Sequence, residues 1–183
     1  MSKDFKKDIS IVIPLNNEEK IINDLYLKLK ETLDNLRKTY EIIFVDDGSQ
    51  DGTYAELCRI YSIDRNINIL RLAKNYGQSA ALAAGIDFAR GEIILTMDWD
   101  LQHDPSEIPK FLEKAYLGYD LVIGWRKHRA DNLFSKRIPS LVGNKLIKLI
   151  FKTELHDISS NYRAYRSNVI KDIGLYGGLH RFI

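Results

Sequence analysis

The sequence predicts an α/β protein with a doubly wound, mostly parallel central sheet flanked by helices. Short apolar runs alternate with helix-like segments from residue 8 to residue 124, which is the order that gives parallel strands joined by crossover helices. Polar residues follow directly after these runs. In an open α/β sheet the carboxyl ends of the strands share one edge, where ligands bind.

The first half of the chain contains two strand–helix pairs. An apolar stripe at three- and four-residue steps predicts a first helix of about five turns, and a polar turn precedes the second helix. The expected elements are a strand at Asp8–Pro14, a helix at Ile22–Leu36, a strand at Tyr40–Val45 and a helix around Leu57 capped by Ser49 or Asp51.

The second half continues the alternation. A helix rich in Ala and Gly is expected to pack closely on the sheet, and a proline near the start of a later helix suits its first turn. The expected elements are a strand at Asn68–Leu72, a helix at Ala80–Ala89, a strand at Glu92–Met97, a helix from Asp104 and a strand at Tyr119–Gly124.

Length and composition indicate an ordinary globular protein. With 183 residues, 45% of them hydrophobic and 28% charged, residues 1–183 are expected to form a single domain. One cysteine, Cys58, excludes internal disulfides and cysteine-rich zinc sites, and we expect a buried thiol. Neither a signal peptide nor a run of about 18 apolar residues is visible, which favours a cytoplasmic location.

The fourth strand leads into alternating oxygen-bearing side chains, Asp98, Asp100 and Gln102. Carboxylate and amide oxygens are the ligands preferred by Mg²⁺ and Mn²⁺, which keep positions open for phosphate. An exposed acidic turn is the alternative explanation for this segment taken alone.

A second acidic cluster, Asp46 and Asp47, follows the second strand. Its carboxylates are suited to accept hydrogen bonds from a base N–H or from ribose hydroxyls. The chain lacks the Gly-x-Gly-x-x-Gly fingerprint after its first strand and has no Gly-x-x-x-x-Gly-Lys-Ser/Thr loop. A nucleotide held through a metal is therefore the interpretation that remains.

Three ordered motifs, Ile11–Glu18, Val45–Thr53 and Met97–His103, resemble those of family-two glycosyltransferases with the A-type fold. Within that family the chain is most similar to the polyprenyl-phosphate branch, typified by dolichol-phosphate mannose synthase. The segments Gly124–Lys127 and Gly178–Ile183 point to the same branch.

The resemblance implies roles for individual positions. The nucleotide sugar, with UDP or GDP as carrier, would contact Pro14, Asn17, Glu18, Val45, Asp46, Asp47, Gly77, Gln78 and Asp98. Mg²⁺ or Mn²⁺ would be held by Asp98, Asp100 and Gln102, the acceptor phosphate by Arg126, Lys136 and Ser140, and the catalytic groups would be Asp100, Arg126 and Lys136. Three features depart from the family pattern: Trp99 replaces a small residue, Lys136 stands where arginine is common, and Ser159–Tyr162 stands in a segment that usually contains glycine.

The expected reaction is metal-dependent, inverting transfer of the sugar to a polyprenyl (dolichyl or undecaprenyl) phosphate at the cytoplasmic membrane face. A phosphate acceptor is already an anion near neutral pH, so no general base is required. His103 is expected to have a structural or hydrogen-bonding role, and Asp157 is a further site candidate. Two alternatives stay open: transfer to a polysaccharide or other non-lipid acceptor, and a catalytically silent domain that binds a sugar nucleotide.

Residues 125–152 carry eight Lys/Arg and one acid, a net charge of +7 in a chain whose total is +2. The apolar face of residues 138–152 is typical of a helix that lies on an anionic membrane surface, although an ordinary core-packed helix has the same pattern. Nucleic acid is disfavoured, because no aromatic stacking pattern accompanies the charge. We expect a peripheral membrane protein, C-terminally truncated here, whose full-length form is membrane-anchored.

Overall fold

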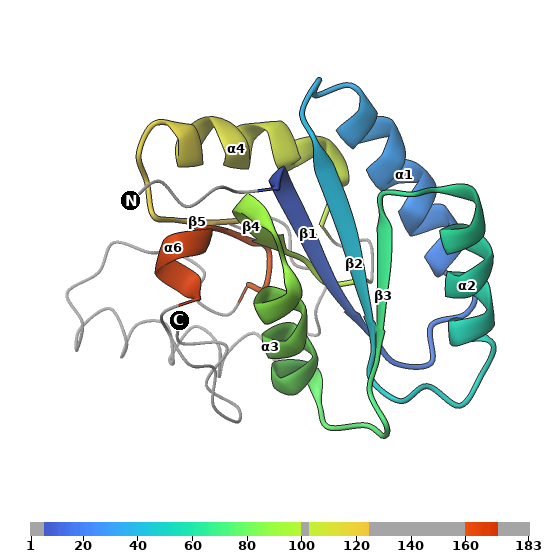
Figure 1. The fold of residues 1–183 in the computed structure, drawn as a ribbon. Coiled ribbons are helices and arrows are strands. Elements are labelled where there is room, and N and C mark those ends of the chain that lie inside the picture. Colours follow the sequence, from blue (N-terminus) through green and yellow to red (C-terminus); the bar gives the residue numbers. More distant parts are fainter. Residues whose placement is uncertain (1–5, 100–102, 125–159, 172–183) are drawn as a thin grey trace, which may run out of the picture.

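The computed structural model describes residues 6–99, 103–124 and 160–171. Within these ranges six strands form one sheet in the order β3-β2-β1-β4-β6-β5 (Figure 1). The strands are β1 Lys7–Leu15, β2 Tyr40–Asp46, β3 Ile67–Arg71, β4 Gly91–Thr96, β5 Leu121–Ile123 and β6 Arg163–Arg166. The helices are α1 Ile22–Asp34, α2 Thr53–Ile63, α3 Gln78–Phe88, the 3-10 turn η1 Pro105–Glu107, α4 Ile108–Tyr116 and α6 Ser167–Ile170.

The first four strands are parallel, as the alternating pattern predicts. β1 pairs with β2 on one side and β4 on the other, and β2 pairs with β3. β6 runs antiparallel to β4, with Thr96 opposite Arg163. The start of β6 therefore lies beside the carboxyl end of β4, so residues just before Arg163 reach the edge where the parallel strands end.

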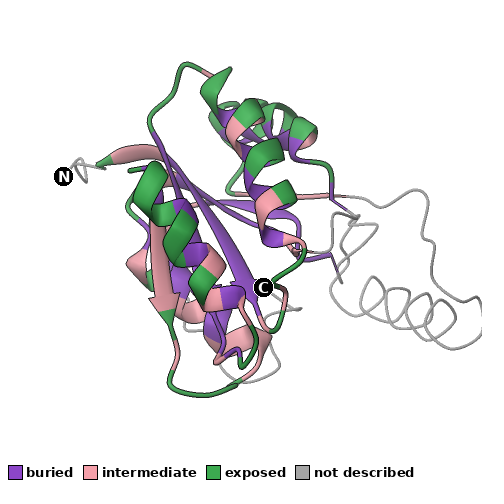
Figure 2. Cartoon of the chain, turned by 90° about the vertical axis from the view of Figure 1, so that its right-hand side faces the viewer, coloured by how far each residue is buried: buried purple, intermediate pink, exposed green. Residues whose placement is uncertain are grey.

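Successive side chains of β1 point to opposite faces of the sheet and belong to two different apolar layers. Ile11 and Ile13 pack with the inner faces of α1, α2 and α4, whereas Val12 packs with α3 and α6. Figure 2 shows the buried strands between helices whose outer faces are exposed. Burial on both faces explains why these strands are nearly continuous apolar runs.

The small-residue helix α3 packs closely on the sheet, as expected from its Ala and Gly content. A Cβ atom at Gly85 would collide with the side chain of Val12 and would press on Val45. The absence of a side chain at Gly85 thus lets α3 approach β1 and β2, which brings its first residue, Gln78, toward the ends of the strands.

Two expectations about helices need correction. α1 ends at Asp34 after 13 residues, which is about three and a half turns rather than five. Leu36 is only partly buried beyond the helix, and Arg37 has a left-handed φ of 51°. Cys58 is exposed, because the buried stripe of α2 is Thr53, Leu57 and Ile60, which leaves residue 58 on the outer face.

No helix within the described ranges is long and apolar enough to cross a membrane. Several predicted features lie outside the described residues. These are Asp100, Gln102, Arg126, Lys136, Ser140, Asp157 and the basic segment 138–152.

Candidate functional site

The polar clusters that follow β1, β2 and β3 are joined to one another by hydrogen bonds. Asn16, after β1, donates from Nδ2 to the backbone oxygen of Asp47 at 2.7 Å. Asn75, after β3, donates from Nδ2 to Asn16 Oδ1 at 3.1 Å. The convergence expected from the strand order is thus present in the described part of the edge.

Asp47 supports the loop that precedes α3. Its two carboxylate oxygens accept the backbone amides of Tyr76 and Gly77, each at 2.8 Å. Its own amide donates to the backbone oxygen of Leu15 at 2.8 Å, and its side chain is almost fully buried. Asp47 therefore has a scaffold role that its sequence pattern did not indicate, and its predicted contact with a nucleotide stays a prediction.

Asp46 is fully buried. Oδ1 accepts the backbone amide of Ser49 at 2.9 Å. Oδ2 forms an ion pair with Arg71 Nε at 3.3 Å, yet it accepts no hydrogen bond of acceptable geometry from the described residues. The guanidinium of Arg71 stacks over the ring of Tyr54 at 4.2 Å, so a charged acceptor and a partly exposed cation lie together at the ends of β2 and β3.

A cavity of about 590 Å³ opens at the same place. It is lined by Gly48, Ser49, Gln50, Arg71, Leu72, Ala73, Lys74 and Asn75. Gly48 has a φ of 69°, and a Cβ there would collide with the backbone of Lys74. Glycine is thus required for the close approach of the loops after β2 and β3, which form the walls of this cavity.

The first motif is held against the second by backbone and side-chain contacts. Pro14 and Val45 are buried partners in the β1–β2 register. Asn17, with a left-handed φ of 60°, donates its amide to Ser49 Oγ at 2.9 Å and accepts the amide of Gln50 at 2.8 Å. The amide of Glu18 donates to Thr53 Oγ1 at 2.8 Å. Asn17 therefore contacts two residues that line the cavity, whereas Pro14 and Val45 are buried within the sheet.

Asp98, two residues beyond β4, receives amide donors from two other elements. Gln78 Nε2 donates to its Oδ1 at 2.7 Å, and Asn161 Nδ2 donates to the same oxygen at 3.1 Å. Gly77, which precedes Gln78, is the residue held by Asp47. Asn161 was missed by the sequence analysis, because its place at the site depends on β6 returning antiparallel to β4.

A divalent metal requires several oxygen ligands. Of the three predicted ligands, Asp98 alone lies within the described residues, where no cluster of three His, Cys, Asp or Glu side chains forms a metal site. Asp98 itself fits the role in kind. It supplies hard carboxylate oxygens at a strand end and is only partly buried. Among the described residues, Oδ2 has one contact, of 3.4 Å, from Asn161.

His103 is buried and is not exposed at the edge where the parallel strands end. Its ring lies 4.9 Å from the ring of Tyr162, which in turn lies 4.3 Å from Phe111. Tyr162 donates its hydroxyl to the backbone oxygen of Asp104 at 3.1 Å, and burial raises its pKa far above the ordinary value. The expected structural role of His103 agrees with this packing.

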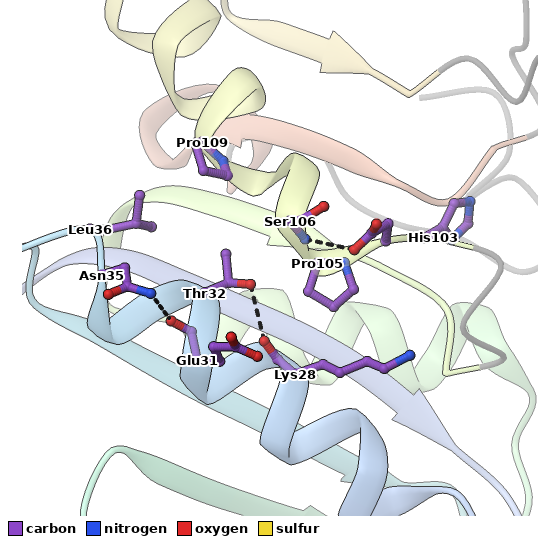
Figure 3. Close-up of a pocket in the computed structure, with 10 residues that line it drawn as sticks. Lys28, Glu31, Thr32, Asn35, Leu36, His103, Pro105, Ser106 and Pro109 are labelled. Atoms are coloured by element: carbon purple, nitrogen blue, oxygen red, sulfur yellow. Dashed lines mark hydrogen bonds between the residues drawn. The ribbon is translucent and has the colours of Figure 1, made fainter.

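A second hollow, of about 710 Å³, lies between α1 and η1 (Figure 3). Its polar groups are largely engaged along their own segments. Thr32 donates to the oxygen of Lys28, Asn35 donates to the oxygen of Glu31, and the amide of Ser106 donates to Asp104. Donors and acceptors do not converge on its centre, so we place the candidate site at the strand ends instead.

Comparison with known proteins gives matches along almost the whole chain. A family model described as glycosyl transferase family 2 matches residues 10–174. A dodecaprenyl-phosphate galacturonate synthase of Rhizobium johnstonii is 41% identical over 180 residues, covering 96% of this chain and 53% of the relative. An undecaprenyl-phosphate 4-deoxy-4-formamido-L-arabinose transferase of Shewanella sediminis is 39% identical over 165 residues, covering 89% and 49%. The chain spans about half the length of these curated relatives.

Solved structures share the fold at low identity. Glucosyl-3-phosphoglycerate synthase from Mycobacterium tuberculosis, in complex with Mn²⁺, UDP and glucosyl-3-phosphoglycerate, superposes with a TM-score of 0.66 at 20% identity, covering 89% of this chain and 58% of its own. The mannosyltransferase PcManGT from Pyrobaculum calidifontis, in complex with GDP-Man and Mn²⁺, gives 0.67 at 19% identity, covering 95% and 48%. These likenesses show the A-type glycosyltransferase fold.

Proposed function

The chain belongs to glycosyl transferase family 2, and from this premise we propose that it is the nucleotide-sugar-binding part of an enzyme that transfers a sugar to a polyprenyl phosphate. The observation that carries the proposal is the hydrogen-bonded edge that joins Asn16, Asp47 and Gly77 and presents Asp98 beside them. Relatives that cover most of the chain are named for dodecaprenyl- and undecaprenyl-phosphate acceptors.

The donor is a nucleoside-diphosphate sugar bound at the carboxyl ends of β1 to β4. The cavity beside Arg71 offers the polar side chains of Ser49, Gln50 and Asn75 to a base or ribose. UDP and GDP-Man occur in complexes of structural neighbours, so both carriers are candidates. Pro14, Asn17, Glu18 and Val45 border the same nucleotide.

A divalent ion, Mg²⁺ or Mn²⁺, belongs to this proposal, since neighbours of the same fold were crystallised with Mn²⁺. Asp98, Asp100 and Gln102 would hold it. Bound there, it would neutralise the charge that develops on the departing diphosphate.

The acceptor phosphate would be received by Arg126, Lys136 and Ser140. Their charges and hydrogen bonds offset the repulsion between the incoming phosphate and the donor diphosphate, and they orient the attacking oxygen. That oxygen forms a bond to the anomeric carbon while the bond from that carbon to the diphosphate oxygen breaks, which inverts the configuration. The acceptor is already ionised, so no side chain has to remove a proton.

The proposed setting is the cytoplasmic face of a membrane, because a polyprenyl chain keeps the acceptor in the bilayer. The basic segment 125–152, with a net charge of +7, would be attracted to anionic lipid headgroups at such a surface.

The test is a transfer assay with tritiated UDP- and GDP-sugars, undecaprenyl phosphate in detergent, and Mn²⁺ or Mg²⁺. We expect radioactivity from one donor to enter the organic phase as a lipid-linked sugar, and Asp98→Ala to abolish this. Asp24→Ala, an exposed change on α1, is the matched control. Transfer only to a water-soluble acceptor would contradict the lipid assignment and favour the non-lipid alternative.

A further inference from the structure

The carboxylate of Asp98 is held from two sides by amides that are distant in the sequence. Gln78 reaches it from the first turn of α3, and Asn161 reaches it from the segment before β6. Their donor atoms lie 2.7 Å and 3.1 Å from Oδ1. We call these three residues the Asp98 clamp.

The clamp engages the two carboxylate oxygens unequally. An ionised carboxylate only accepts hydrogen bonds, so each amide must turn its NH2 group toward it. Both NH2 groups are directed at Oδ1, whereas among the described residues Oδ2 has a single contact of 3.4 Å, from Asn161 Nδ2. A contact of that length is weak. Oδ2 is therefore the oxygen with the greater remaining capacity to bind a ligand.

Asn161 is itself firmly placed. It is 8% exposed, and its backbone oxygen accepts a hydrogen bond from Thr96 Oγ1 at 2.8 Å. Thr96 is the last residue of β4 and stands two positions before Asp98. The donor and the carboxylate are thus attached to the same strand end, and Arg163 Nε binds the oxygen of Ser160 at 2.7 Å to fix the turn before Asn161.

The second donor is tied to the other acidic cluster. Asp47 holds the backbone amide of Gly77, and the next residue is Gln78. A continuous series of contacts therefore runs from the end of β2, through the start of α3, to Asp98. Side chains supported in this way keep their geometry better than side chains on an unsupported loop.

We propose that Asn161, together with Gln78, is a positioning residue for Asp98: the two amides fix the carboxylate through Oδ1 and direct Oδ2 to the metal–diphosphate group of the donor. This inference rests on the proposed function. Hydrogen-bonding partners of metal-binding carboxylates commonly change metal affinity about 10-fold to 100-fold when removed, and we expect a loss of this size here.

The experiment measures binding of UDP-glucose and GDP-mannose by calorimetry, with and without Mn²⁺, for the wild type, Asn161→Ala and Gln78→Ala. Each variant should weaken Mn²⁺-dependent nucleotide binding about 10-fold or more, and Asn161→Ala should leave metal-free binding within about 2-fold. Gln78→Ala leaves β6 untouched, so it covers the case in which Asn161→Ala fails to fold. The control is Asn35→Ala, which removes an amide that bonds Glu31 on the exposed surface of α1.

A double-mutant cycle with Asp98→Ala separates positioning from a general structural effect. If Asn161 acts through Asp98, Asn161→Ala should lower the free energy of unfolding less in the Asp98→Ala background than in the wild type. Equal losses in both backgrounds would overturn the inference, as would unchanged Mn²⁺-dependent binding in the single variants.

A ligand-free measurement keeps failure of the clamp distinct from failure of the proposed function. In ¹⁵N-labelled protein, the side-chain NH2 resonances of Gln78 and Asn161 should both shift in Asp98→Ala. Resonances that stay in place would overturn the clamp whatever the protein binds. If the resonances shift in Asp98→Ala but the wild type binds neither nucleotide, the geometry of the clamp is supported. The proposed function is then overturned, and with it the role of Oδ2 in metal binding.

Discussion

Asp47 accepts the backbone amide of Gly77 at 2.8 Å. This contact, with the matching one to Tyr76, joins the end of β2 to the start of α3. The Asp47 carboxylate, which the sequence analysis assigned to nucleotide binding, therefore supports the loop that precedes Gln78. Loss of this support should disturb Asp98, which follows β4 and accepts a hydrogen bond from Gln78.

Asp47→Ala should loosen the loop before α3 more than it lowers overall stability. The amide of Tyr76 loses its acceptor, so its hydrogen exchange should accelerate about 5-fold, since a lost bond is worth about 1 kcal/mol. The amide of Gly77 also donates to Asn75 Oδ1 at 3.0 Å, so its exchange should accelerate less. Exchange measured by NMR tests this, with the exposed Asp24→Ala on α1 as the control. Unchanged exchange at both amides would contradict a scaffold role.

Glu41 should be a stability residue with no direct role in ligand binding. It is buried at the amino ends of the strands, where its carboxylate accepts Ser10 Oγ at 2.7 Å, the amide of Arg90 at 2.7 Å and Asn68 Nδ2 at 3.0 Å. Glu41→Ala removes the acceptor of the Ser10 hydroxyl and the Asn68 amide, while the Arg90 amide keeps Ser10 Oγ at 3.2 Å. It should lower the free energy of unfolding by about 1–3 kcal/mol.

Urea denaturation measures that loss, and Glu113→Ala, on the exposed side of α4, should change the unfolding free energy by less than about 0.5 kcal/mol. Nucleotide affinity of the folded Glu41→Ala protein should stay at the wild-type value. A selective loss of affinity would show that the amino ends of the strands communicate with the site.

Gly85→Ala should destabilise the protein although alanine is the better helix former. The helix propensity gain is about 1 kcal/mol, but the new methyl group would collide with Val12 and press on Val45. Overpacking of this kind costs about 1–3 kcal/mol, and β-branched neighbours adjust poorly. We expect a lower thermal midpoint, whereas Asp87→Ala on the exposed face of α3 should not lower it.

The acid sensitivity of the fold should depend in part on Asp8. Hydrogen bonds from the Thr39 side chain and backbone amide, each 2.7 Å, hold the pKa of this carboxyl below its ordinary value. A lowered folded-state pKa contributes stability that is present above the unfolded pKa of about 3.9 and is lost as the pH falls through the folded value.

The difference in thermal midpoint between the wild type and Asp8→Ala should therefore be largest above about pH 5 and shrink below about pH 4. Asp24→Ala serves as the comparison across the same pH series. A difference that stays constant down to low pH would mean that the Asp8 carboxylate does not contribute through its ionised form.

Much of the fold was predictable because local pattern and global topology agree. The apolar runs that form β1, β2 and β4 are buried on both faces. Such continuous runs can be recognised from the sequence alone. The predicted end of the first helix was wrong, because Leu36 continues the apolar spacing although the helix ends at Asp34. The prediction for Cys58 was wrong because it rested on the usual burial of cysteine, whereas the stripe of Thr53, Leu57 and Ile60 places residue 58 on the outer face.

The candidate site was predictable where it follows parallel strands, and less so elsewhere. Asn16, Asp47 and Gln78 lie at one edge because strand order dictates it. Asn161 could not be found in the same way, since its position depends on β6 pairing antiparallel with β4, a long-range event. The preference of Asp47 for backbone amides likewise depends on the path of the loop after β3.

The central claim is that this edge binds a nucleoside-diphosphate sugar through a divalent metal. The most direct test is calorimetric titration of UDP-glucose and GDP-mannose, with and without Mn²⁺, into the wild type and the Asp98→Ala and Asp100→Ala variants. We expect one nucleotide to bind in a Mn²⁺-dependent manner and both variants to lose that dependence. Binding that ignores Mn²⁺, or that survives unchanged in both variants, would contradict the claim.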